Sequence, residues 1–122
     1  MKRSLLSIFF LLIVTLAAVA QPRISSNKET HNFGQIEWKR PVTVEYTITN
    51  TGNQPLVLTN VTTSCACAVA DWTKEPIAPG KSGDVKITYN PAGRPGVFAK
   101  AISIYSNGKK GSFILTIKGK VK

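Results

Sequence analysis

Two cysteines separated by one residue, Cys65 and Cys67, have the most distinctive chemistry in this chain. They are its only cysteines and lie in the run Ser64-Cys65-Ala66-Cys67. Two thiolates at this spacing are soft ligands that suit Cu(I) or Zn²⁺. The same residues can also form a disulfide or remain a buried pair of thiols. These uses need different backbone shapes and different neighbours.

A metal site on this pair lacks further ligands. His31 is the only histidine, and Met1 is the only methionine. A closed zinc site takes four ligands, so within one chain the cysteines would need His31 and a carboxylate beside them. Cys65 and Cys67 therefore remain candidate metal ligands only for a two-coordinate Cu(I) site or a site shared between chains. We expect no cofactor.

A disulfide between Cys65 and Cys67 depends on the backbone at Ala66. In an extended strand, residues two apart are separated by about 6.6–6.8 Å, whereas disulfide-bonded Cβ atoms are about 3.5–4.5 Å apart. The bond therefore needs a bend, and the entropy that so small a loop removes from the unfolded chain contributes only about 1.6 kcal/mol. The alternative is a pair of thiols buried beneath Trp72, which protects them in an oxidising compartment.

Catalysis is not indicated. A cysteine nucleophile would need an adjacent base, and His31 is the only imidazole in the chain. The six acidic residues are single and scattered, so no pair of carboxylates suggests a general acid and a general base. We predict no catalytic residues and a protein that is not an enzyme.

The N-terminus resembles a secretory leader. Lys2 and Arg3 precede an apolar run that ends at Ala18-Val19-Ala20. A basic start, a short apolar stretch and an Ala-x-Ala site are typical of a cleaved signal peptide. We predict removal of residues 1–20, a single mature domain at 21–122, and export to the periplasm or cell surface. No cysteine follows the cleavage site, so a lipoprotein is not expected.

The mature chain is basic. Removing residues 1–20 takes away two of the 16 basic residues, and the remaining 14 against six acidic residues give a formal net charge of +8. Such a charge attracts anions, including acidic polysaccharides and anionic lipids. No aromatic ladder accompanies the bases, and nucleic acid is not a partner that an exported protein commonly meets, so we expect none. A thinly spread, solvated basic surface is the alternative.

The remaining pattern is that of an all-β chain. Apolar and polar residues alternate in short runs, and Gly, Pro and Asn separate these runs. About seven strands favour an immunoglobulin-like β-sandwich, with an open barrel as the alternative. A bulge is expected between Leu58 and Val61, where strict alternation fails. The expected strands cover residues 23–34, 42–50, 55–63, 69–72, 84–89, 97–106 and 110–121.

Several of these runs together resemble a bacterial family called domain of unknown function 1573. The most specific match is Ser64-Cys65-x-Cys67. The resemblance implies an exported immunoglobulin-like domain, related to major-sperm-protein-like domains, in a family typical of Bacteroidetes. It implies no activity. The family usually has Gly where this chain has Ala66, and Ala reaches sharply bent conformations less easily. Further matches are Phe33-Gly34-x-Ile36, Asn50-x-Gly52, Pro55-Leu56-x-Leu58, Trp72, Pro79-Gly80, Gly96-x-Phe98, Ser106-Asn107 and Ile117-x-Gly119-x-Val121.

Three hypotheses for function follow. The leading one is a non-enzymatic, exported structural or protein-interaction module that holds another envelope or surface protein. An exposed edge strand is one surface that could bind such a partner. The second is a thiol-based redox or copper-binding module that uses Cys65 and Cys67. The third is a basic module that attaches to anionic glycan or lipid. The sequence identifies neither the partner nor the oligomeric state.

Overall fold

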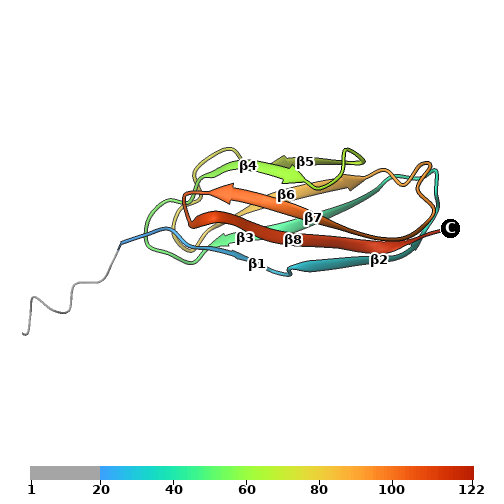
Figure 1. Cartoon of the computed structure of the whole chain (residues 1–122). Helices are drawn as coiled ribbons and strands as arrows, with labels where there is room; N and C mark the ends of the chain where they lie inside the picture. The colour runs from blue at the N-terminus through green and yellow to red at the C-terminus, as the bar shows by residue number, and fades with distance from the viewer. Residues whose placement is uncertain (1–19) are drawn as a thin grey trace, which may run out of the picture.

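The fold is a sandwich of two four-stranded β-sheets, described for residues 20–122 of a computed structural model (Figure 1). Sheet A has the strand order β1-β3-β6-β5, and sheet B has the order β2-β8-β7-β4. The predicted leader falls almost wholly outside the described residues. The strands are β1 (Ile24–Ser26), β2 (Thr30–Ile36), β3 (Val42–Asn50), β4 (Leu58–Thr63), β5 (Ala68–Trp72), β6 (Ser82–Tyr89), β7 (Gly96–Ser106) and β8 (Lys109–Val121).

Alternation of apolar and polar residues explains the central strands. In β3, Val44, Tyr46 and Ile48 are buried, and Glu45 and Thr47 between them are exposed. The neighbouring β6 follows the same two-residue period and pairs with β3 over eight residue pairs. One face of sheet A is therefore core and the other is solvated, as the period of two requires. The all-β class and the sandwich are confirmed.

The N-terminal segment forms two strands rather than one broken strand, so the sandwich has eight strands instead of about seven. β1 pairs antiparallel with β3 in sheet A, and β2 pairs parallel with β8 in sheet B. The chain thus crosses between the sheets after Ser26. The bulge expected between Leu58 and Val61 is confirmed, because the pairing of β4 with β7 shifts register between Leu58 and Asn60.

Two tyrosines from sheet A reach across the core to sheet B in different ways. The Tyr46 hydroxyl donates a hydrogen bond of 2.8 Å to the Thr116 carbonyl of β8. Tyr89 stacks on Phe98 of β7, with ring centroids 4.3 Å apart, and its buried hydroxyl has no hydrogen-bond partner among the described residues. Burial raises the pKa of Tyr46 to about 12, so its hydroxyl remains a donor throughout the physiological range.

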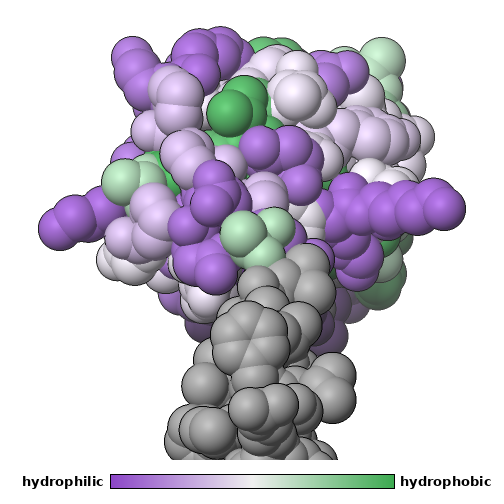
Figure 2. Space-filling model, turned by 90° about the vertical axis from the view of Figure 1, so that its left-hand side faces the viewer, coloured by the Kyte–Doolittle hydropathy of each residue, from purple (hydrophilic) through white to green (hydrophobic). Residues whose placement is uncertain are grey.

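The surface at the end where the described chain begins is mainly hydrophilic. Figure 2 looks onto this end, and hydrophobic residues form only small separate spots on the visible surface. Across residues 20–122, no helix is long and apolar enough to cross a membrane. Larger exposed apolar side chains lie instead on the strands and, for Trp38, in the loop between β2 and β3.

Candidate functional site

The two cysteines lie in a tight bend that joins β4 of sheet B to β5 of sheet A. Their sulfur atoms are joined in a disulfide, and their Cα atoms are 5.1 Å apart. Residues 64–67 belong to no strand, so the bend that the bond requires is present. The Cys65 carbonyl accepts hydrogen bonds from the Thr63 hydroxyl (2.7 Å) and from the Ala68 N–H (3.2 Å). The backbone therefore supports the turn independently of the sulfur atoms.

Ala66 does not obstruct this turn. No residue other than glycine has positive φ in the described chain, so the bend uses conformations open to alanine. Cys67 is buried at 7% exposure, and Cys65 is partly exposed. Trp72 does not cover the pair, because it ends β5 whereas Cys67 immediately precedes that strand. At about 3.3 Å per residue, the far end of β5 is more than 10 Å away.

His31 lies at the opposite edge of sheet B from the cysteines. β2 and β4 are separated by β8 and β7, so three strand spacings of about 4.8 Å put His31 roughly 14 Å from the cysteine side of the sheet. Its ring packs edge-on against Phe33, and its Nδ1 accepts a 3.2 Å hydrogen bond from the Lys28 ammonium. Burial, and secondarily the Lys28 charge, lowers the pKa of His31. A cysteine–histidine couple is not formed.

Three carboxylates that are far apart in sequence meet on the outer face of sheet A. Glu45, Asp71 and Asp84 line a depression of about 250 Å³ together with Lys86, Trp72 and Thr73. Sequence reasoning missed this grouping, because it follows from the register of β3, β6 and β5. Within residues 20–122, no group of three or more His, Cys, Asp or Glu residues is arranged to hold a metal ion.

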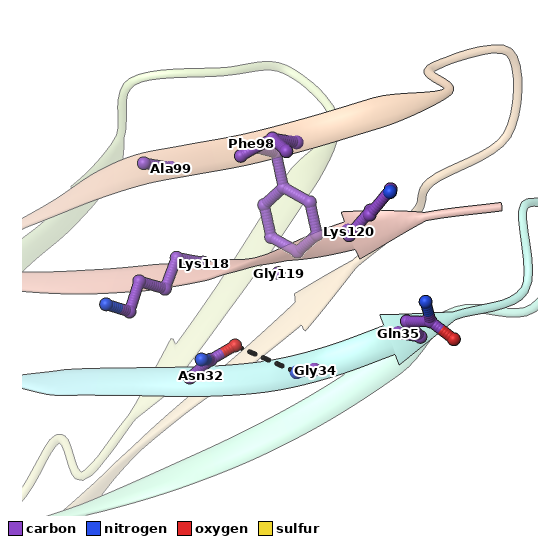
Figure 3. A pocket seen from close by; sticks show the side chains of 9 residues that line it. Asn32, Gly34, Gln35, Phe98, Ala99, Lys118, Gly119 and Lys120 are labelled. Atoms are coloured by element: carbon purple, nitrogen blue, oxygen red, sulfur yellow. Dashed lines mark hydrogen bonds between the residues drawn. The ribbon is translucent and has the colours of Figure 1, made fainter.

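A larger hollow of about 410 Å³ lies over β2, β7 and β8. It forms where the pairing of β2 with β8 shifts register between Asn32 and Gln35. Gly34 has φ of 71° in this bulge, and the Asn32 side chain holds it by accepting the Gly34 N–H at 2.9 Å (Figure 3). A bulge with glycine at positive φ bends an edge strand and leaves part of the ladder open.

Gly119 of β8 lies beneath the hollow, and the lack of a side chain there leaves room for the Phe98 ring on the core side of the strand. Gly119 pairs with Phe98 of β7, and the Phe98 ring extends over it (Figure 3). A Cβ atom at position 119 would lie 2.9 Å from both the Gly34 carbonyl oxygen and the Phe98 ring. The ring lies on the core side of Gly119, where it stacks on Tyr89, so the base of the hollow is backbone. In Figure 3, Lys118 and Lys120 extend from it in opposite directions.

The outer face of sheet B combines apolar and basic side chains. Val97 is 83% exposed, Ile114 is 48% exposed and Tyr105 is 40% exposed. The strands of sheet B contain five lysines and no carboxylate. The strands of sheet A contain three carboxylates and one lysine. The five lysines of sheet B are Lys100, Lys109, Lys110, Lys118 and Lys120.

Three edge strands have a backbone N–H already occupied by a local side chain. In β4, Val61 N–H donates to the Asn60 side-chain oxygen at 3.0 Å. In β5, Trp72 N–H donates to the Asp71 carboxylate at 3.0 Å, and Gly34 is held in the same manner in β2. Addition of a partner strand needs free N–H groups. The face of sheet B is therefore better suited to contact than these edges.

A comparison with known protein families identifies the family of this chain. A model described as protein of unknown function (DUF1573) matches residues 24–121. The chain belongs to this family. The DUF1573 match covers every strand of both sheets, and it includes the cysteine turn and the hollow. No curated protein matches the chain.

Solved structures with the same fold come from diverse proteins. A Porphyromonas gingivalis W83 protein of unknown function has a TM-score of 0.74 at 24% identity over 88% of this chain. A PapD-like domain of human CEP192 has a TM-score of 0.70 at 11% identity, covering 88% of this chain and 90% of that domain. The secreted serine protease VesC of Vibrio cholerae has a TM-score of 0.62 at 20% identity over 81% of this chain. This chain spans 50% of the Porphyromonas protein and 23% of VesC. At these identities the likeness shows the fold alone.

Proposed function

We propose that this DUF1573 chain is a non-enzymatic structural or protein-interaction module, exported to the periplasm or cell surface. It contacts another envelope or surface protein through the outer face of sheet B. The observation that carries the proposal is the exposure of Ile114 and Tyr105, which are diagonal neighbours across β7 and β8 on that face, because adjoining exposed apolar side chains mark interaction sites. Val97 lies on the same face about 20 Å further along β7. The basic and apolar leader at residues 1–20 supports export.

The arrangement of the reactive groups supports a role without catalysis. Both sulfur atoms are joined to each other, and His31 lies across the sheet from them. The three grouped carboxylates share their depression with Lys86, and none has a neighbouring histidine or thiol there. A redox or copper-binding role for Cys65 and Cys67 would first require reduction of the disulfide.

Site-specific photo-crosslinking tests this function. A photoreactive amino acid at Ile114, on the outer face of sheet B, should trap one discrete envelope protein in intact cells. The same group at Thr88 on the outer face of sheet A is the matched control and should trap none. Crosslinking at Thr88 but not at Ile114 would overturn the choice of face, and no protein adduct at either position would overturn the proposal.

A double substitution separates the thiol-based alternative. C65A together with C67A removes the disulfide and both thiols, and it should leave the Ile114 crosslink unchanged. Loss of the crosslink in this variant, while the domain remains folded by circular dichroism, would favour the thiol-based function. Attachment to anionic glycan or lipid would instead produce no protein adduct and binding that falls steeply with added salt.

A further inference from the structure

We infer that the hollow between Gly34 and Gly119 is the docking site for an acidic polypeptide segment that carries one apolar side chain among its carboxylates. The inference rests on the proposed function and names the chemistry of its partner. The apolar side chain enters the hollow, and the flanking carboxylates reach Lys118 and Lys120. Charge, shape and neighbouring surface each contribute to this assignment.

Charge selects an acidic partner. The mature chain has six acidic residues, and none of them lies on the four strands of sheet B. Lys118 and Lys120 border the hollow and have no ion pair in the described residues, where the two salt bridges are Arg40–Glu37 and Lys74–Asp71. A basic surface without local carboxylates favours a partner of opposite charge and disfavours a basic one.

The shape selects an apolar side chain between the charges. The base of the hollow consists of the backbone at Phe98 and Gly119, whose side-chain positions face the core, and the outward side chains of Val97 and Ala99 give it apolar surface. Lys118 and Lys120 extend away from this base in opposite directions (Figure 3). An occupant therefore meets apolar surface at the centre and positive charge on two sides. The Asn32 and Gln35 amides at the β2 side can hydrogen-bond its backbone.

A protein segment fits this surface better than a lipid bilayer. Bilayers bind protruding apolar side chains that insert among the acyl chains. A recess with a glycine at its base is filled instead by a side chain that protrudes from a partner, as in the central pockets of protein interfaces. Further along the same face of sheet B, Thr62, Ser103 and Thr116 add polar groups that a bilayer interior would leave without hydrogen bonds.

A peptide titration followed by NMR tests the assignment. The probe is an acetylated and amidated peptide, Glu-Glu-Ser-Phe-Ser-Glu-Glu, added to ¹⁵N-labelled mature chain at low salt. Its addition should shift the amide signals of Gly34, Ala99 and Gly119. A peptide with Ser in place of Phe should bind several-fold more weakly. Binding should weaken as salt rises, because exposed charge pairs are screened.

Charge reversal supplies the matched variants. K118E with K120E should weaken binding of the peptide about tenfold, since two exposed attractive pairs become repulsive. K86E makes one such reversal on sheet A and should leave binding unchanged. Peptide shifts centred on sheet A, or equal binding of the Phe and Ser peptides, would overturn the assignment.

A vesicle experiment tests the lipid alternative. Vesicles of phosphatidylglycerol should not sediment the mature chain at physiological salt. Sedimentation of the native chain that K118E with K120E abolishes, without any peptide shift, would overturn the assignment in favour of a membrane. The assignment and the proposed function fail separately: a crosslink at Ile114 without peptide binding at the hollow refutes only the chemistry of the partner.

Discussion

The two outer faces of the sandwich differ in both charge and polarity. Sheet A presents threonine and serine hydroxyls with Glu45, Asp71 and Asp84, together with one large exposed apolar side chain, Val69 on β5. Sheet B presents lysines together with Val97, Ile114 and Tyr105. Both faces contain a depression, of about 250 Å³ on sheet A and about 410 Å³ on sheet B. The depression on sheet B has glycine backbone at its base, at Gly34 and Gly119, whereas that on sheet A is lined by Trp72 and the three carboxylates.

This difference shows that net charge alone describes the surface poorly. A formal net charge of +8 over residues 21–122, with bases scattered along the chain, suggests a uniformly basic surface. The strand order instead collects five lysines in one sheet and three carboxylates in the other. Opposite faces with opposite charges can discriminate between partners, whereas a uniform charge attracts every anion.

The largest expected effect comes from adding a side chain at Gly119, on the core side of sheet B beneath the hollow. G119A places a Cβ atom 2.9 Å from the Gly34 carbonyl oxygen and the Phe98 ring. We expect the free energy of unfolding in urea to fall by about 1–3 kcal/mol, as for other overpacked sites. F98L removes part of the clash, so G119A should cost less in that background. Equal costs in both backgrounds would show that Phe98 does not set the space at position 119.

Removing the disulfide within the bend from β4 to β5 should have a somewhat smaller effect. C65A with C67A opens a loop of three residues, whose closure contributes about 1.6 kcal/mol in the chain-entropy model. Hydrogen bonds from Thr63 and Ala68 to the Cys65 carbonyl keep the turn in place. Urea unfolding measures the change. A loss above about 3 kcal/mol would show that the disulfide organises more of the domain than its own turn.

The two tyrosines that cross from sheet A to sheet B provide a matched pair. Y46F removes a hydroxyl that donates to the Thr116 carbonyl, and it should cost about 1 kcal/mol of unfolding free energy. Y89F removes a buried hydroxyl without a partner among the described residues, so stability should stay within about 0.5 kcal/mol or rise. A larger cost for Y89F than for Y46F would contradict this assignment of hydrogen bonds.

The smallest expected effect is the pH dependence at the β2 edge of sheet B. The lowered pKa of His31 arises first from burial and then from Lys28. As pH falls through the unfolded value of 6.5, the unfolded chain binds a proton that the folded chain accepts only at lower pH, so stability decreases. H31N should therefore flatten the decline of Tm between neutral and mildly acidic pH. A steeper fall of Tm in H31N than in the native chain would contradict this prediction, because it would mean that protonated His31 stabilises the fold.

The sequence predicted the elements whose pattern is local. The alternation from Val42 to Tyr46 and onward to Asn50 located β3 with the bounds that the structure has. The break in alternation between Leu58 and Val61 located the bulge of β4. The spacing of Cys65 and Cys67 also showed that a bond between them requires a bend. Each conclusion depends on residues that are near one another in the chain.

The sequence did not predict features that depend on register between distant segments. The Phe98 ring meets Gly119 because of the pairing of β7 with β8, and the recess opens because β2 bulges at Gly34. A glycine inside the strand pattern at position 119 was the available signal, since such a residue often marks close backbone approach. Similarly, the segregation of charge follows only once β2 is assigned to sheet B and β3 to sheet A.

The parallel pairing of β2 with β8 has a mechanical consequence. The described chain enters at one end of the sandwich, and its C-terminus leaves at the other end (Figure 1). A force that pulls these two ends apart slides β2 and β8 along each other, because the two strands run in the same direction. The hydrogen bonds of this ladder are then loaded together in shear instead of opening one at a time. Tension from the N-terminal side first meets the short pairing of β1 with β3, and the longer parallel pair of β2 with β8 then resists it before it reaches β6.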